Sequence, residues 1–98
     1  MKATADQMVA LRHLWVIANG HSGQCRIVAR FLLGLYNGTR FPFDMTDFRC
    51  LDSELFEECL TVLRMDNTPA AEVHVLLGVP GQAFEKLADD WRIEDRAR

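Results

Sequence analysis

The sequence of 98 residues lacks the features that identify membrane-spanning and secreted proteins. No apolar run approaches the ~18 residues that a transmembrane helix requires. At the N-terminus, Asp6, Gln7 and Arg12 interrupt the chain where a signal peptide would have its apolar stretch. We therefore expect a cytoplasmic protein with no membrane contact.

Cysteine is scarce, with Cys25, Cys50 and Cys59 as the three representatives and no CxxC pair. An odd number argues against a disulfide framework, and the missing CxxC argues against a zinc ribbon. Each cysteine stands in an apolar context, where a free thiol behaves as a small hydrophobe. The sequence therefore predicts three buried, reduced cysteines.

Catalytic and cofactor motifs are missing as well. The three histidines, His13, His21 and His74, form no HExxH and no pair at i, i+4 spacing. The stretch GHSG at residues 20–23 is too short for a phosphate-binding loop and lacks its Lys-Ser/Thr. We predict no enzyme, no cofactor and no metal site. One alternative stays open, a nucleophile assembled in space from Cys25 or Cys59 with His74.

What the sequence does contain is a succession of amphipathic helical patterns. Apolar residues recur at three- and four-residue spacing along most of the chain, and little room is left for strands. We predict an all-α fold, a compact bundle of about five short helices that forms a single domain over residues 1–98. The polar end, residues 93–98, should fray.

Capping residues locate the ends of these helices. Hydroxyl and carboxylate side chains satisfy free N–H groups at a helix start, and glycine after a helix end accepts a left-handed conformation. We expect such a conformation at Gly20. The predicted starts are the capping box of Thr4 with Gln7, then Ser22, Asp52 and the pair Thr68-Pro69, and the predicted ends are Asn19-Gly20 and Asn37-Gly38.

Two phenylalanines flank Pro42 in the segment that follows the second predicted helix. Pro42 cannot continue a helix, and in an extended segment side chains two positions apart point to the same side. We therefore expect an extended Phe-Pro-Phe loop in which Phe41 and Phe43 enter the core while Arg40 and Pro42 face outward. The alternative is that the two rings form an exposed patch that binds a partner.

The net charge of −3 is unevenly distributed. Residues 1–50 hold six basic and three acidic side chains, a balance of +3, whereas residues 51–98 hold five basic and eleven acidic ones, a balance of −6. A pI near 5.5 argues against a dedicated nucleic-acid-binding domain, which is usually basic. The arginines of the first half could still form a local basic face.

Two groups of charged residues are candidates for an interaction surface. Arg26 and Arg30 lie one helical turn apart, and Tyr36, Arg40 and Arg49 could join them to hold phosphates or to pair with the acidic half. An acidic group could attract a basic protein, although helix caps and a solvated face account for it as well. Its members are Asp44, Asp47, Asp52, Glu54, Glu57 and Glu58.

The stretch FLLGLYNGTRFPFDMTDFRCLDSELFEECLTVLRMD, residues 31–66, resembles a family of small uncharacterised proteins encoded on conjugative and integrative elements of proteobacteria. The similarity continues through EVH at residues 72–74 and reaches Trp91, but LLGVPG at residues 76–81 replaces a more polar link. No activity is established for that family, so the resemblance implies a context and no catalytic residues.

The resemblance implies an accessory protein of a mobile element, and such proteins often act by binding. We expect a non-enzymatic interaction protein with a protein partner, which could inhibit a bacterial defence system; a homodimer is also open. One alternative is a nucleic-acid accessory factor that uses Arg26, Arg30, Arg40 and Arg49. The other is an enzyme with spatially assembled Cys and His.

Overall fold

The structure is a computed structural model that describes residues 2–97. Within that range the chain forms helices and no strand, so the predicted all-α class is confirmed. The α-helices are joined by short connections and one 3-10 helix, η1. The elements are α1 (Ala5–Ala18), α2 (Gly23–Asn37), η1 (Met45–Cys50), α3 (Ser53–Asp66), α4 (Val73–Leu77) and α5 (Gly81–Trp91).

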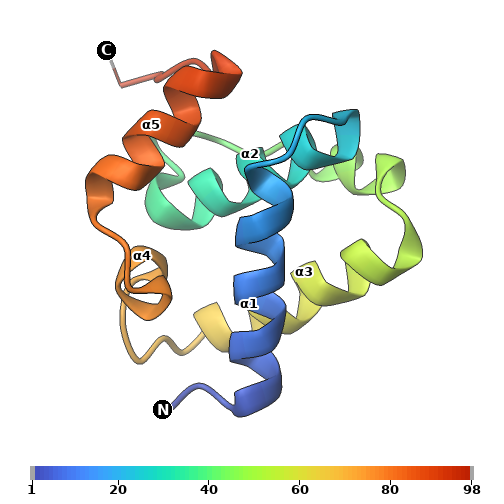
Figure 1. The fold of residues 1–98 in the computed structure, drawn as a ribbon, viewed down its shortest axis with the longest axis vertical. Helices are drawn as coiled ribbons and strands as arrows, with labels where there is room; N and C mark the ends of the chain where they lie inside the picture. The colour runs from blue at the N-terminus through green and yellow to red at the C-terminus, as the bar shows by residue number, and fades with distance from the viewer. Residues whose placement is uncertain (1, 98) are drawn as a thin grey trace.

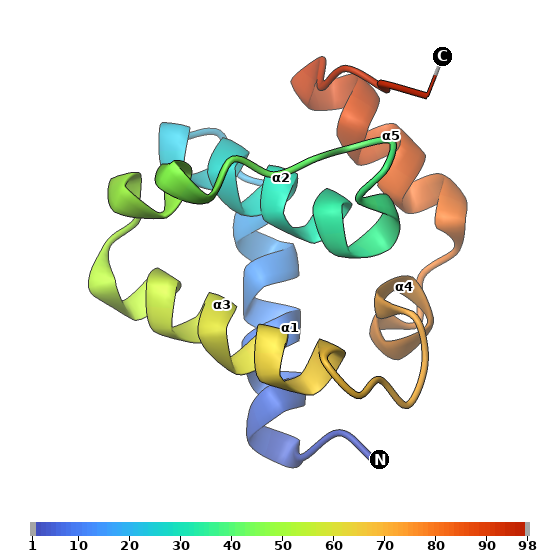
Figure 2. The same ribbon diagram turned by 180° about the vertical axis from the view of Figure 1, so that it is seen from behind.

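Helix α1 lies at the centre and runs along the long axis of the molecule (Figure 1). It packs on α2 and α3, while α2 also packs on α4, α5 and η1. Seen from behind, the segment that follows α2 passes along the outer side of that helix towards η1 (Figure 2). Helix α2 therefore connects the α1–α3 side of the molecule with the α5 side.

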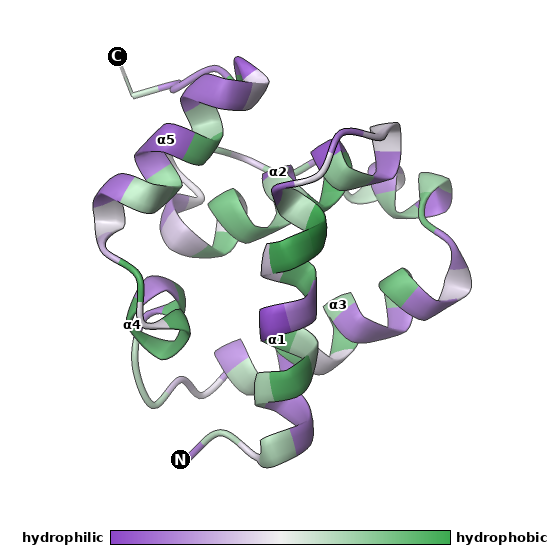
Figure 3. Cartoon of the chain, in the orientation of Figure 1, coloured by the Kyte–Doolittle hydropathy of each residue, from purple (hydrophilic) through white to green (hydrophobic). Residues whose placement is uncertain are grey.

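The core collects the inward faces of these helices. The largest fully buried side chains include Leu11 and Leu14 of α1, Leu32 and Leu33 of α2, and Phe84 of α5. Each such side chain contributes roughly 1.5–3 kcal/mol when it leaves water. Polar and apolar residues interchange along the ribbons, as expected of helices that bury one face (Figure 3).

The predicted helix starts at Thr4, Ser22 and Asp52 are confirmed. Thr4 Oγ1 accepts a hydrogen bond from the Gln7 N–H at 3.1 Å, and Gln7 Oε1 accepts one from the Thr4 N–H at 2.9 Å. Ser22 and Asp52 accept in the same way from the backbone N–H groups three residues further on. Local side-chain chemistry thus decides where α1, α2 and α3 begin.

Two expectations about helix ends are wrong. Gly20 is not left-handed, because positive φ occurs in residues 2–97 only at Gly78 and Arg92. A Cβ at position 20 would lie 2.7 Å from Cys25 Sγ, so a larger residue there would have to displace this thiol. Thr68-Pro69 does not start a helix either. Helix α4 begins at Val73 instead. A helix this short is not stable alone, and the burial of Val73 in the core holds it in place.

The cysteines are only partly as predicted. Cys59 is buried, and this burial raises the pKa of its thiol to about 12. Cys25 is partly exposed. Cys50 is exposed, because η1 turns Phe48, and not Cys50, toward the core. Hydrogen bonds from Ser22 and nearby backbone groups outweigh the desolvation of Cys25 and lower its pKa. All three thiols lie in the described part of the chain and are free there.

The two phenylalanines beside Pro42 both contact the core, to different extents. Phe41 is 3% exposed, whereas Phe43 is partly exposed and packs against Phe31 and Phe48, with ring centroids 5.7 and 4.9 Å away. Pro42 is exposed. Arg40, however, does not face outward, because acidic side chains of the second half of the chain hold it.

Candidate functional site

Residues 92–97, called the C-terminal segment below, fold back onto the chain that follows α2. The backbone N–H of Arg96 donates to the carbonyl oxygen of Arg40 at 2.8 Å, and Ile93 packs against the core. Ile93, Asp95 and Arg96, which belong to the end that was expected to fray, thus contact the body of the molecule; residue 98 lies outside the described residues. These contacts bring the acidic half of the chain against the basic half.

A specific backbone motif turns the chain back after α5. Arg92 N–H donates to Asp89 O at 3.1 Å and Ile93 N–H donates to Ala88 O at 2.9 Å, the hydrogen-bond pattern of a Schellman motif. The residue after the helix, Arg92, takes φ 54 in the left-handed region. A non-glycine residue there costs roughly 1–2 kcal/mol, since its Cβ crowds the following carbonyl oxygen.

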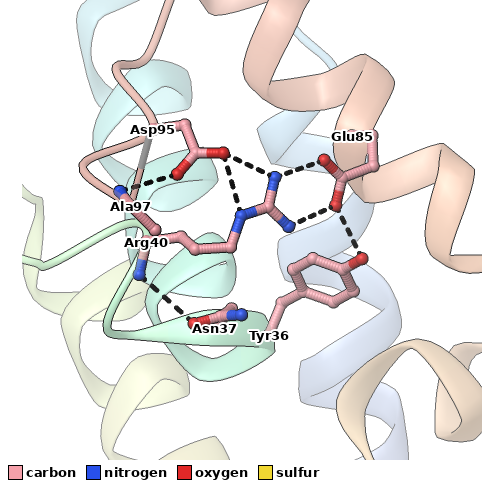
Figure 4. Close-up of polar contacts among 6 residues, drawn as sticks. All are labelled: Tyr36, Asn37, Arg40, Glu85, Asp95 and Ala97. Carbon is pink, nitrogen blue, oxygen red and sulfur yellow. Dashed lines mark hydrogen bonds and ion pairs between the residues drawn. The ribbon is translucent and has the colours of Figure 1, made fainter.

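Arg40 lies between two carboxylates that come from α5 and the C-terminal segment (Figure 4). Its Nη1 and Nη2 atoms donate to Glu85 at 2.8 and 2.6 Å, and its Nε atom donates to Asp95 at 3.0 Å. The Tyr36 hydroxyl donates to the same Glu85 carboxylate at 2.7 Å. Charge-assisted, two-pronged contacts of this kind are the strong class of hydrogen bonds. We call these four residues the Arg40 clamp.

The clamp shifts the proton affinity of its members. The hydrogen bonds from Arg40, and then the one from Tyr36, lower the pKa of Glu85 to about 2. The bond to Glu85, and then partial burial, raise the pKa of Tyr36 above its usual value. Hydrogen bonds to Glu85 and Asp95 raise the pKa of Arg40 as well. The sequence placed Tyr36 and Arg40 on an interaction surface, but their polar groups are engaged within the molecule.

Beside the clamp, four arginines line a groove of about 240 Å³. Arg26 and Arg30 come from the outer face of α2, and Arg92 and Arg96 come from the C-terminal segment. No hydrogen bond or ion pair joins these four side chains to another residue in the range 2–97. We call this site the arginine groove. Its remaining lining residues are Phe41, Pro42, Ile93 and Glu94.

One atom of the groove is buried without a partner. The Nε atom of Arg30 is shielded from solvent and has no hydrogen-bond acceptor among the described residues. A shielded, unpaired N–H group is costly, typically by 1–3 kcal/mol. Arg30 also lines the groove together with three further arginines, and this concentration of positive charge favours an anionic group there.

The acidic residues singled out by the sequence do not form one site. Asp44 caps η1 by accepting from the Thr46 N–H and hydroxyl at 2.9 and 2.7 Å, and these bonds, followed by the charges of Arg30 and Arg49, lower its pKa. Asp52 caps α3, and Glu58 contacts His13 at 2.7 Å. The remaining members stand separately: Asp47 is partly exposed in η1, and Glu54 and Glu57 are exposed on α3.

Sequence reasoning found half of the groove. It placed Arg26 and Arg30 on one helix face, but it also expected Arg40, which is clamped, and Arg49, which does not line the groove. It missed Arg92 and Arg96, since both follow the last helix in a segment with no periodic pattern. The only local feature that could have pointed to these two arginines is the high content of charged residues in the C-terminal segment.

None of the helices within residues 2–97 combines the length and the apolar character needed to cross a membrane. No group of three or more His, Cys, Asp or Glu side chains in that range is arranged to hold a metal ion.

Fold and site together define a small all-helical protein whose C-terminal segment completes a basic groove. The chain belongs to a family of unknown function, DUF7673, whose sequence model matches residues 8–92. The match includes Arg26, Arg30, Arg40 and Glu85 and ends just before Ile93, so most of the C-terminal segment lies beyond it. No curated protein and no solved structure matches the chain.

Proposed function

We propose that this protein is a non-enzymatic interaction protein and that the arginine groove is its contact surface. The observation that carries the proposal is the convergence of four arginine side chains, unpaired among the described residues, from two segments more than fifty positions apart in the sequence. A guanidinium group is always charged at physiological pH and presents five donors in a fixed fork. Four such groups with no acceptor within residues 2–97 are available to a partner.

The composition of the groove suits a protein contact. Arginine is enriched at protein interfaces and among the residues that dominate binding energy. Exposed Pro42 and half-buried Ile93 add an apolar wall beside the charges. The groove therefore offers charged anchors together with an adjoining apolar surface.

The proposal can be tested by capture from a proteobacterial lysate. We expect the immobilised protein to retain a partner, and Arg30→Gln to lose it. Arg12→Gln is the matched control, because Arg12 is exposed on α1 outside the groove and its removal changes the net charge equally. Equal retention by all three well-folded proteins, or no partner for any of them, would contradict the proposal.

The setting of this function is also a proposal. We infer from the segment YNGTRFPFD and the residues around it that the protein is an accessory factor of a mobile element. We further infer that it acts in the cytoplasm and could block a host defence complex. The resemblance of residues 31–66 to proteins of conjugative and integrative elements supports this inference. The neighbouring genes test it, since transfer or integration genes should lie beside the coding sequence.

A nucleic-acid accessory factor is the second candidate, and the same four arginines favour it. Phosphate contacts would make binding strongly salt-dependent, with log K falling by ~0.9 per phosphate neutralised for each log unit of salt. The surface would differ from the one expected from sequence, because Arg40 is held by Glu85 and Asp95. An electrophoretic shift that is absent even at low salt would remove this candidate.

A further inference from the structure

The positive charge of the arginine groove is concentrated and bounded. Four guanidinium groups face a single carboxylate in the groove lining, that of Glu94, which leaves a local balance of +3. A second groove, of about 280 Å³, shares Ile93 with it and is lined by acidic residues around the paired Arg40. Those acidic residues are Glu85, Asp89, Glu94 and Asp95.

This boundary limits the kind of anion that fits. A DNA duplex carries a charge every ~1.7 Å along its axis, so phosphates beyond the groove would meet the acidic residues of the second groove. The whole chain, at −3, would also repel a long polyanion. An acidic peptide can place carboxylates over the arginines and neutral residues over the acidic side.

The Arg40 clamp shows how carboxylates are held in the same neighbourhood. One guanidinium there binds two carboxylates with donor–acceptor distances of 2.6 to 3.0 Å. The groove beside it has four guanidinium groups and lacks the carboxylates to match them. Arg30 is one of these four, and its Nε atom has no acceptor among the described residues.

We infer that the arginine groove binds an acidic segment of a partner protein, with at least two carboxylates seated on the guanidinium groups of Arg26, Arg30, Arg92 and Arg96. This inference rests on the proposed function and specifies the chemistry of the partner. Exposed Pro42 would contact an apolar residue next to the acidic ones. The C-terminal segment supplies half of the site, so the site exists only while that segment is docked.

The test uses a fluorescein-labelled oligoglutamate peptide and fluorescence anisotropy at low salt. An oligoglutamine peptide of equal length and a labelled DNA duplex are the comparison probes. We expect oligoglutamate to bind and oligoglutamine not to bind. Arg30→Gln should weaken the binding about tenfold, since a charge-assisted contact is worth enough to change affinity by that factor. Arg12→Gln should change it less than about twofold, as expected for an exposed charge outside the site.

Arg92→Gly separates binding from folding. Glycine suits the left-handed φ of 54 at this position, so the variant should fold at least as well as the wild type. It nevertheless removes one guanidinium from the groove and should weaken oligoglutamate binding about tenfold. A loss of binding in this variant, with an unfolding midpoint no lower than that of the wild type, therefore comes from the missing guanidinium group and not from unfolding.

Several outcomes would overturn the inference. They are an absence of oligoglutamate binding, a loss of oligoglutamate binding in Arg12→Gln as large as that in Arg30→Gln, or duplex binding that depends on Arg30 while oligoglutamate binds weakly. If oligoglutamate fails but a captured partner still depends on Arg30, the acidic class is wrong and the proposed function stands. If neither the peptide nor a partner depends on Arg30, both proposals fail.

Discussion

The acidic groove around the Arg40 clamp and the arginine groove share Phe41, Ile93 and Glu94 in their linings, yet the arginines of the clamp and of the arginine groove are used differently. In the clamp, one arginine is held by two carboxylates of the same chain. In the groove, four arginines have no acceptor among the described residues. The comparison teaches that the position of the acidic residues in space decides which arginines hold the fold together and which remain available.

The largest expected effect comes from Phe41, which lines both grooves. Phe41 is 3% exposed and lies under the Arg40 guanidinium, whose carbon is 4.8 Å from the ring centroid. Phe41→Ala should cost about 3–5 kcal/mol of unfolding free energy, the usual range for a buried aromatic ring. A domain holds only ~5–15 kcal/mol in total, so a thermal melt should show a much lower midpoint.

Phe43→Ala provides the comparison for this substitution. Phe43 is partly exposed, and its loss should cost less, about 2 kcal/mol. An unchanged midpoint for both variants would mean that neither ring supports the core. The segment YNGTRFPFD would then become the leading candidate for the contact surface in place of the arginine groove.

Arg40→Gln should produce the next largest effect, because it leaves Glu85 and Asp95 without their shared partner. We expect a lower unfolding midpoint at neutral pH than for the wild type, and a smaller loss than for Phe41→Ala. Arg30→Gln is the matched control, since it removes the same charge from a side chain that has no ion pair. Equal midpoints for the two arginine variants would contradict the distinction between clamp and groove.

The pH dependence sharpens this test. Glu85 titrates near its usual pKa of 4.5 when unfolded, and the Arg40 and Tyr36 hydrogen bonds lower its pKa to about 2 in the fold. A lowered pKa contributes stability that is fully present above the unfolded value and is lost as the pH falls through the folded value. The difference between wild type and Arg40→Gln should therefore shrink between pH 4.5 and about 2.

A smaller effect should appear in the titration of Tyr36. The chain has one tyrosine, so phenolate absorbance reports on this residue alone. Its pKa should lie above the usual value because the hydroxyl donates to the Glu85 carboxylate. Glu85→Gln should move the midpoint back down. No movement would show that the hydrogen bond between the two side chains is not formed in solution.

The smallest expected change in stability is that of Arg92→Gly. Relief of the left-handed strain should leave the unfolding free energy unchanged or raise it by up to about 1 kcal/mol. Chemical denaturation measures this difference. A clear destabilisation would mean that the Arg92 side chain supports the fold, and the residue would then belong with the clamp rather than with the groove.

The sequence was informative where structure depends on nearby residues. Caps at Thr4, Ser22 and Asp52 and the apolar spacing of the helices set three helix starts and the all-α class, because a cap and its N–H group lie within three positions. Gly20 shows the limit of such reasoning. That glycine packs against the thiol of Cys25, a contact that no local turn rule contains.

The sites could be only partly predicted, because their residues meet across the whole chain. Arg40 binds Asp95 at a separation of 55 positions, and nothing in the sequence selects this pair over others between a basic and an acidic half. The same docking brings Arg92 and Arg96 beside Arg26 and Arg30. A polar chain end without apolar periodicity resembles a frayed tail until that long-range contact is known.

Amide hydrogen exchange at Arg96 tests most directly whether the C-terminal segment is docked and thereby completes the groove. Its N–H donates to the Arg40 carbonyl oxygen at 2.8 Å, so we expect exchange at least about tenfold slower than in an unstructured chain. In Arg40→Gln that protection should be lost while the amides of α1 stay protected. Exchange of Arg96 at the unstructured rate in the wild-type protein would show a frayed end and contradict the account of the groove.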